Sequence, residues 1–414
     1  MGNSAVSTRD RVDRNKSFPL SGIRVADFTH MVAGPYGTLQ LAYFGAEVIK
    51  VESKARPDTW RIREGNKDVE QSRPFADHNR NKLSVTINLK SREGKEIVYR
   101  LIRISDVVVE NFSAGVMDRL GLDYQTLKRI KPDIIMASMQ GLGRTGPRKD
   151  HVTWGPSLMP YSGLTYLWNE PKAETPVGSQ TAYPDYVVSL HMAYAVMAAL
   201  HYRRRTGKGQ YIDIAQAEVT ASLIGAALLD YLVNQRVAAP KGNHSLTRSP
   251  HGCYRCKGED RWCVISVADD NQWAVFCSAI GNPSLAAHPK FDTLLRRLKN
   301  REELDIIIQQ WTAQLTASEA MEKLQGAGIS AGIVHNAATL SEDGHLRERG
   351  FIGVHEHPRQ GQIHLPGIVA SLSKTPGKIV RHAPLLGQDN DYVFRDLLGL
   401  TEEEIERLAA AGAF

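Results

Sequence analysis

Short apolar runs alternate with amphipathic stretches through the first half of the chain. Ile23–Phe28 and Glu47–Glu52 have the Val- and Ile-containing pattern of buried strands, and Tyr36–Phe44 between them has the pattern of a helix. Pro35 suits the first helical position, and Gly45 suits a left-handed C-terminal end. A strand, a helix and a second strand in this order predict a parallel strand pair joined by a right-handed crossover.

The same alternation continues along the chain. Further strands are predicted over Leu83–Leu89, Val107–Glu110, Ile134–Ser138 and Tyr211–Ile214, and further helices over Ser91–Ile104, Pro184–His201 and Ala217–Arg236. Strands that alternate with helices predict an α/β domain with a mainly parallel sheet. Ligands of such sheets bind at the carboxyl ends of the strands. We therefore expect the site in the loops Thr29–Pro35, Asn111–Ala114 and Gln140–Gly146.

The second half of the chain has a different texture. Cys253–Lys257 and Arg261–Ala268 resemble the two strands of a hairpin, and helical segments follow. Past Gly344 the chain is strand-like again, and Thr401 with Glu404 predicts a capping box for a last helix. The expected organisation is a flexible leader (1–18), the first part of a large domain (19–215), a linker helix and loop (216–250), a small α+β domain (251–335), and a return to the large domain with a C-terminal helix (336–414).

Composition limits the classes of function. Apolar residues make up 42% of the chain and charged residues 23%, as in globular proteins, and no run of 18 apolar residues is present to span a membrane. The net charge of +6 is spread along the sequence, which suits a phosphate-bearing small ligand better than a nucleic acid. Four cysteines in so long a chain favour the reducing cytoplasm over a disulfide scaffold.

The common catalytic motifs are missing or incomplete. Gly141 to Gly146 matches the string G-x-G-x-x-G, but Pro147 follows where a dinucleotide fold opens a helix, which favours a glycine-rich turn. Cys253 and Cys256 have the C-x-x-C spacing of zinc ligands without a second such pair, so small core residues are the preferred interpretation. No H-E-x-x-H, G-x-S-x-G or phosphate loop is present. We predict no metal site and simpler catalytic machinery.

A lone carboxylate is the remaining candidate. Asp185 lies just before or at the start of the predicted Ala-rich helix. On local pattern alone, such an Asp is an N-cap or first-turn acid that stabilises the helix. The helix dipole would also keep the carboxylate ionised, and a carboxylate can form covalent acyl intermediates. Both interpretations remain open on this evidence.

At this point the chain resembles the family III CoA-transferases, the CaiB/BaiF type that includes formyl-CoA transferase. The resemblance runs from Leu20 to the C-terminal helix and depends on several separated strings. These are Leu20–Thr29 with Ala33-Gly34-Pro35, Leu41–Glu52, Asn79–Lys82 with Glu93–Lys95, Asp106–Phe112, Gly146-Pro147, Ser162-Gly163, Asp185, Arg204–Gln210 and Ala383–Gly387. No single string is diagnostic, but their order and spacing are specific.

The resemblance implies a mechanism and a set of CoA contacts. Asp185 would attack the donor thioester and carry acyl and CoA groups in turn, with CoA as substrate and no permanently bound cofactor. The CoA contacts that carry over by position are Met31, Val32, Ala33, Lys82, Leu83, Asn111, Phe112 and Arg119. Two positions depart from formyl-CoA transferase: its arginine after the second strand aligns with Ser53, beside Lys54, and a lysine aligns with Gln140. Its glycine-rich loop is replaced by Ser249–Tyr254, so formate and oxalate are not expected substrates.

The resemblance also implies an assembly and a range of substrates. The family fold has a Rossmann-like large domain built from both chain ends, a smaller α+β domain, and a ring-shaped chain interlocked with a second copy in a dimer. Trp154, Tyr183 and Tyr186 suggest a pocket for a bulky or aromatic acid, and the segment is similar to the subgroup that transfers CoA from succinyl-CoA to benzylsuccinate. One alternative is an acyl-CoA racemase, although Trp154 stands where racemases have a histidine. The other is a subunit of a heteromeric transferase.

Overall fold

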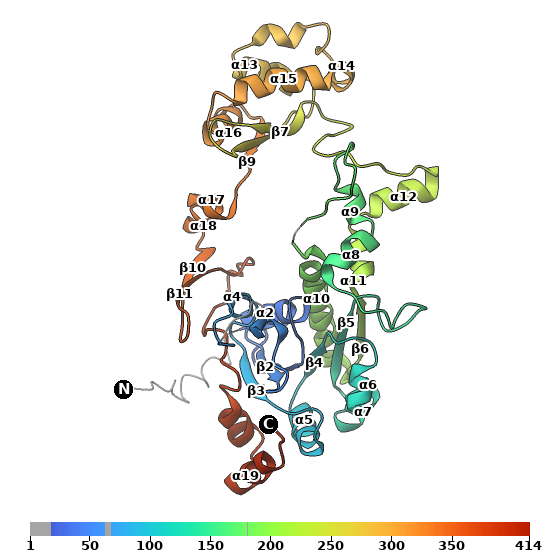
Figure 1. Cartoon of the computed structure of the whole chain (residues 1–414), viewed down its shortest axis with the longest axis vertical. Helices are drawn as coiled ribbons and strands as arrows, with labels where there is room; N and C mark the ends of the chain where they lie inside the picture. Colours follow the sequence, from blue (N-terminus) through green and yellow to red (C-terminus); the bar gives the residue numbers. More distant parts are fainter. Residues whose placement is uncertain (1–17, 63–67, 180) are drawn as a thin grey trace. The chain divides into compact units, whose positions relative to one another are not determined.

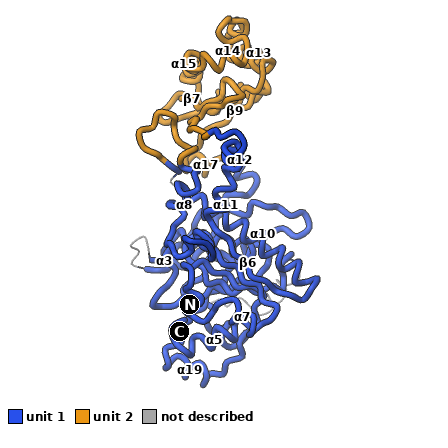
Figure 2. The backbone as a smooth tube through the Cα atoms, turned by 90° about the vertical axis from the view of Figure 1, so that its right-hand side faces the viewer, with its two compact units in different colours: residues 1–165, 178–236, 345–414 blue, residues 166–177, 237–344 orange. Residues whose placement is uncertain are grey.

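The computed structural model describes residues 18–62, 68–179 and 181–414, so the predicted leader lies outside the described residues except for Phe18. The chain divides into two compact units (Figure 2). Unit 1 comprises 1–165, 178–236 and 345–414, and unit 2 comprises 166–177 and 237–344.

Unit 1 is built on a six-stranded sheet in which all neighbouring strands are parallel (Figure 1). Its strands are β1 (Arg24–Asp27), β2 (Glu47–Glu52), β3 (Leu83–Thr86), β4 (Val107–Glu110), β5 (Ile135–Gln140) and β6 (Tyr211–Ala215). Their order is β3-β2-β1-β4-β5-β6, so the direction of strand addition reverses between β1 and β4. The predicted α/β domain with a parallel sheet is confirmed, and the reversal marks the place where ligands of such sheets bind.

Helices cover both faces of this sheet because alternate strand residues point to opposite sides. On one face Val25 and Val107 pack with α2 (Ala33–Tyr43) and α10 (Tyr183–Thr206). On the other face Ala26 and Val108 pack with α5 (Arg92–Arg103), α7 (Tyr124–Ile130) and C-terminal residues such as Phe394 and Leu408. Strands buried on both sides explain the continuous apolar runs of the sequence.

Two predicted helices differ from the structure. Helix α2 begins at Ala33, so Pro35 is its third residue and not its first. The single helix predicted over Ala217–Arg236 is wrong: α11 (Gln216–Ser222) and α12 (Gly225–Asn234) are bent by 72°. The N–H groups of Leu223 and Ile224 bond carbonyls three residues back, which tightens the chain between the two helices.

The C-terminal segment adds to the edge of the sheet. Asp389 Oδ2 accepts the N–H of Ser84 at 2.9 Å, and Asn390 Oδ1 accepts the N–H of Thr86 at 2.8 Å. The strand-like return is confirmed by the antiparallel pair β10 (Ile352–His357) and β11 (Gly361–Pro366). The short segment η2 (Tyr392–Leu397) and helix α19 (Glu402–Ala410) end the chain, and α19 has the predicted capping box.

Unit 2 contains the predicted hairpin. Strands β7 (His251–Arg255) and β8 (Trp262–Ser266) are antiparallel, and an unpredicted third strand, β9 (Ser330–Ile333), pairs with β8. Its main helices are α13 (Asp270–Ala279), α15 (Arg301–Thr312) and α16 (Ala317–Gly326). Cys256, Cys263 and Cys277 belong to its core, and Cys253 is partly buried.

Within the part of the chain that the structure describes, no single helix is both long and apolar enough to cross a membrane. The bent pair α11 and α12 meets those criteria only when its two members are taken together.

Candidate active site

Asp185 lies in the first turn of α10. The helix begins at Tyr183 after the N-cap residue Ala182, and Pro184 at its second position needs no hydrogen-bond acceptor. Asp185 is therefore a first-turn acid and not the N-cap. Its side chain does not cap the helix; instead Oδ1 accepts a hydrogen bond of 2.7 Å from the Nε2 of Gln216, the first residue of α11.

The environment of Asp185 makes its carboxylate unusually basic. Burial raises the pKa of Asp185 to about 6, and the hydrogen bond from Gln216 offsets only part of this effect. Burial therefore sets the direction of this shift. No basic side chain among the described residues forms an ion pair with Asp185. At pH 7 the group stays mostly ionised, and a more basic carboxylate is a better nucleophile.

Glycines leave room beside this carboxylate. A Cβ atom at Gly155, the first residue of α8 (Gly155–Tyr161), would lie 1.8 Å from Asp185 Oδ2. A Cβ atom at Gly141 would lie 1.6 Å from Thr153 Oγ1, so the loop after β5 packs directly against the segment before α8. The N–H of Ala217 donates to Gly141 O at 2.9 Å. The carboxyl ends of β5 and β6 are therefore drawn together around Asp185.

The loop after β1 reaches the same place through α2. Ser189 Oγ lies 2.6 Å from the carbonyl oxygen of Ala33 and 2.5 Å from that of Asp185. A Cβ at Gly37 would lie 3.0 Å from the Ser189 carbonyl oxygen, so glycine permits the close approach of α2 and α10. The segment Met31–Ala33 that was predicted to line CoA is thereby joined to the first turn of α10.

Several predicted CoA contacts lie together where the strand order reverses. His30 and Asn111, which follow β1 and β4, are joined by two hydrogen bonds of 2.8 Å, one to the backbone N–H and one to the carbonyl of His30. The ring of His30 lies 5.6 Å from that of Phe112. Gln140 Nε2 donates to Glu110 Oε1 at 2.8 Å and to Phe112 O at 3.3 Å. Met31, Asn111, Phe112 and Gln140 thus share one edge of the sheet.

Other predicted contacts are placed differently. Lys82 is fully buried, and its Nζ donates to Asp27 Oδ2 at 3.0 Å and to Pro35 O at 2.9 Å, so its charge is enclosed. Leu83 is partly buried at the start of β3. Lys54 and Arg119 are exposed, and neither side chain forms a hydrogen bond or ion pair within the described chain.

The aromatic residues predicted for the substrate pocket fall into two groups. Trp154 precedes Gly155 and is 55% exposed, and Tyr183 at the start of α10 is 38% exposed. Tyr186 packs edge-on against Tyr36 with ring centroids 5.1 Å apart. Trp154 and Tyr183 can meet a ligand, whereas Tyr186 mainly supports the packing beside Asp185.

The sequence interpretation missed three kinds of residue. Gln216 was not singled out, although it follows a strand directly, and strand ends are where ligand-facing groups are expected. Gly155 could not be identified because its role is a close approach between distant segments. The buried pair Lys50 and Asp58 behind the Met31 loop left no signal, since charged residues are mostly exposed.

The parallel sheet with a reversal of strand order between β1 and β4 defines an α/β protein of the class that binds small ligands at this edge, and the basic carboxylate of Asp185 is joined to the loop after β1 through Ser189. Comparison with known proteins gives the family. The model of CoA-transferase family III matches residues 20–390. The chain belongs to CoA-transferase family III.

Relatives agree with this assignment. A Mycobacterium tuberculosis protein described as a probable CoA-transferase is 34% identical over 94% of the chain, which spans only 50% of that protein's length. The alpha subunit of the succinyl-CoA–L-malate CoA-transferase of Chloroflexus aurantiacus is 33% identical, with 95% of this chain and 92% of that one covered. The solved structure of a CaiB/BaiF family protein from Brucella suis has a TM-score of 0.84 at 28% identity, covering 92% of this chain and all of that one.

Proposed function

We propose that the protein moves CoA from an acyl-CoA donor to a carboxylic acid through intermediates carried on Asp185. The observation that carries this proposal is the carboxylate of Asp185, partly buried without a cation and bound at one oxygen by Gln216. Its second oxygen, Oδ2, packs against Gly155, where a Cβ atom would lie 1.8 Å from it. A nucleophile is needed here, because neither metal nor serine chemistry is suggested by the motifs of the sequence.

The transfer proceeds in four balanced steps. An Asp185 oxygen attacks the donor thioester carbonyl, the C–S bond breaks, and a mixed anhydride and CoA thiolate form. The thiolate attacks Cγ of Asp185 and releases the donor acid, which leaves an aspartyl-CoA thioester. The acceptor carboxylate attacks Cγ and frees the thiolate again. The thiolate then attacks the acceptor acyl carbon, forms the product thioester and regenerates the carboxylate of Asp185.

Each tetrahedral intermediate carries an oxyanion that needs hydrogen-bond donors. The N–H groups of Val32 and Ala33 at the start of α2 have no acceptor among the described residues, and Ser189 ties Ala33 to the turn of Asp185. The backbone near Gly141 is the second source of donors, because it packs beside the segment that precedes Gly155.

CoA would lie along the edge formed by the ends of β1, β4 and β5, as substrate and not as a resident cofactor. Met31, Val32, Ala33, Leu83, Asn111, Phe112 and Gln140 would line it. Lys54 and Arg119 are the exposed cations suited to its phosphates. Lys82 would support the site from within, since its ammonium group is enclosed by Asp27 and Pro35.

The name of the Chloroflexus relative supports succinyl-CoA as donor. The exposed rings of Trp154 and Tyr183 beside Asp185 support a bulky or aromatic acceptor such as benzylsuccinate. The resemblance to the family supports a ring-shaped chain interlocked in a homodimer, with a large domain built from both chain ends. That relative is an alpha subunit, which keeps a heteromer with a homologous chain as the alternative assembly.

The test is to trap the intermediates. The protein is incubated with succinyl-CoA, or with whichever acyl-CoA of a panel exchanges with its own labelled acid, and is quenched with hydroxylamine. We expect mass spectrometry of the peptides to find a hydroxamate on Asp185 alone. Turnover without any modification of Asp185 contradicts the proposal. Solvent deuterium entering C2 of a 2-methylacyl-CoA without an acceptor acid would favour a racemase instead.

A further inference from the structure

A buried ion pair lies directly behind the loop that joins β1 to α2. We propose that Lys50 and Asp58 are positioning residues that hold Met31 in a left-handed conformation, so that the N–H groups of Val32 and Ala33 face the reacting thioester. The inference rests on the proposed function, because that function places the thioester beside this loop.

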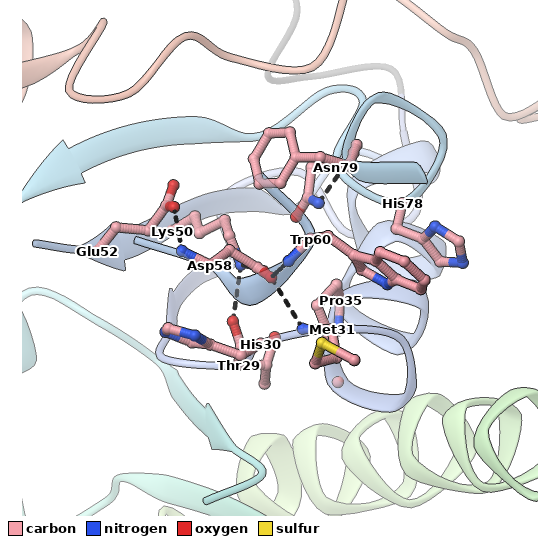
Figure 3. Close-up of polar contacts among 12 residues, drawn as sticks. Thr29, His30, Met31, Pro35, Lys50, Glu52, Asp58, Trp60, His78 and Asn79 are labelled. Carbon is pink, nitrogen blue, oxygen red and sulfur yellow. Dashed lines mark hydrogen bonds and ion pairs between the residues drawn. The ribbon is translucent and has the colours of Figure 1, made fainter. Parts of the chain in front are cut away.

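Both members of the pair contact the loop (Figure 3). Lys50 lies on β2, Asp58 precedes α3 (Thr59–Ile62), and both side chains are 0% exposed, with Nζ and Oδ2 2.8 Å apart. Lys50 Nζ also donates to Thr29 O at 2.7 Å, and Asp58 Oδ1 accepts the N–H of Met31 at 3.0 Å. The two charged side chains therefore bond the loop backbone at Thr29 and at Met31.

From Thr29 to the N–H of Met31, every backbone N–H and carbonyl group of the loop is hydrogen-bonded to a side chain. The N–H of Thr29 donates to Asp27, and the carbonyl of Thr29 accepts from Lys50. The backbone N–H and carbonyl of His30 both bond the side chain of Asn111. The N–H of Met31 donates to Asp58. The next two N–H groups have no acceptor among the described residues. The backbone groups before Met31 are thus hydrogen-bonded within the protein, and the N–H groups after it are available to a ligand.

Met31 itself has an unfavourable backbone conformation. Its φ is 68°, which places a residue with a long side chain in the left-handed region. Such conformations persist where surrounding contacts impose them, and they gather at functional sites. Asp58 is well suited to impose this one, because its own N–H donates to Glu52 Oε1 at 2.9 Å and its Oδ1 also accepts the N–H of Trp60 at 3.0 Å.

Stability alone is a poor explanation for the pair. Two charges lose their hydration when they are buried, and apolar residues of similar volume are often at least as stable in such places. Burial opposes the charge of Asp58, but Lys50 and other groups outweigh it and lower the pKa of Asp58, and the pKa of Lys50 is raised by Asp58 against burial. The pair therefore remains ionised, and its hydrogen bonds to the loop are made by charged groups.

Two double variants separate positioning from packing. Lys50→Met with Asp58→Asn removes both charges but retains an amide oxygen for the N–H of Met31, whereas Lys50→Met with Asp58→Leu removes the acceptor. The readout is kcat and KM for the exchange of labelled acid into its own CoA thioester, together with Tm. We expect the Asn variant, which keeps the acceptor for Met31 but loses the bond from Lys50 to Thr29 O, to lose kcat by about tenfold, and the Leu variant to lose kcat by about 10²-fold with Tm retained, because a displaced oxyanion donor has an effect of this size.

A double-mutant cycle with Met31→Gly tests whether the effect passes through Met31. Glycine adopts positive φ without strain, so the fold-loss caused by Asp58→Leu with Lys50→Met should shrink in the Met31→Gly background. An unchanged fold-loss there, or a folded Leu variant with the kcat of the wild type, overturns the proposal. If that variant does not fold, Asp58→Glu is read instead: it keeps the charge but moves the acceptor, and an unaltered kcat is equally fatal.

A parallel Asp185→Ala variant keeps the two hypotheses apart. If Asp185→Ala retains exchange, the proposed aspartyl chemistry fails, while the comparison of the two double variants still reports whether the loop is positioned by the pair. If Asp185→Ala is inactive and both double variants equal the wild type, only the positioning inference fails.

Discussion

Asp27 and Asp185 are two carboxylates withdrawn from solvent near the same edge of the sheet, and the structure gives them opposite properties. Burial raises the pKa of Asp27, but Lys82, Lys50 and two threonine hydroxyls outweigh it and lower that pKa to about 2. Burial raises the pKa of Asp185 to about 6, and one amide donor offsets only part of the effect. The two side chains differ less in burial than in the charged and hydrogen-bonding groups around them.

The difference teaches what separates a structural carboxylate from a reactive one. Asp27 Oδ2 accepts hydrogen bonds from Lys82 Nζ at 3.0 Å and from Thr38 Oγ1 at 2.7 Å. Its lone pairs are therefore used in contacts that stabilise the fold. Asp185 has one oxygen bound by Gln216, and its other oxygen packs against Gly155 without a hydrogen-bond donor among the described residues. A buried acid without a cation keeps its basicity, and that basicity is available to a substrate.

The largest effect is expected from Asp185→Asn. The amide has nearly the same shape and can still contact Gln216, but it cannot attack a thioester. We expect kcat for CoA exchange to fall at least about 10⁴-fold, as when other enzymes lose their nucleophile, with Tm almost unchanged. Steady-state kinetics on the folded variant provide the check, and retention of a tenth of the activity would count against the nucleophile.

The matched change at Asp27 should act on the fold. Asp27→Asn leaves the buried ammonium of Lys82 without its carboxylate, and breaking a buried pair in this way costs about 3–5 kcal/mol. Denaturant unfolding followed by circular dichroism measures this loss of the free energy of unfolding. The contrast between the two carboxylates disappears if Asp27→Asn is as stable as the wild type.

A smaller effect is expected from Gly155→Ala. The new methyl group would lie 1.8 Å from Asp185 Oδ2 and 2.7 Å from its Cγ, so the carboxylate must turn away. We expect kcat to fall about 10²-fold, because misplacing a reacting group by about an ångström has this effect. Gly225→Ala is the control, since it meets no atom within 4 Å. Equal activity of both variants would refute a catalytic role for the close approach of Gly155 to Asp185.

The smallest effect is a shift of the pH profile. Only ionised Asp185 is a nucleophile, so kcat/KM should fall as the pH drops through its pKa of about 6. Gln216→Met removes the donor that favours the charged form and should move this limb upward by about one pH unit, since such a bond contributes about 1.5 kcal/mol. Gln314→Met on the surface of unit 2 should leave the profile in place. An identical acid limb in both variants contradicts the role of Gln216.

Much of the fold followed from the sequence, and so did the proposal of Asp185 as the main site residue. The parallel sheet was predictable because each strand is an apolar run, and Asp185 was recognisable through the order and spacing of the family strings. The break between α11 and α12 was not predictable, because Leu223 and Ile224 continue the apolar pattern of a helix. The enclosure of Lys82 depends on Asp27, 55 positions away, which no local pattern reveals.

The most direct test of the central claim follows an oxygen atom. When the acceptor acid carries a heavy isotope of oxygen in its carboxylate, attack on the aspartyl thioester and the final attack by CoA thiolate leave one labelled oxygen on Asp185. We predict that peptide mass spectrometry after a single turnover finds one heavy oxygen on Asp185, and none when the CoA donor is omitted. Complete turnover with an unlabelled Asp185 would show that the acyl group never passes through this carboxylate.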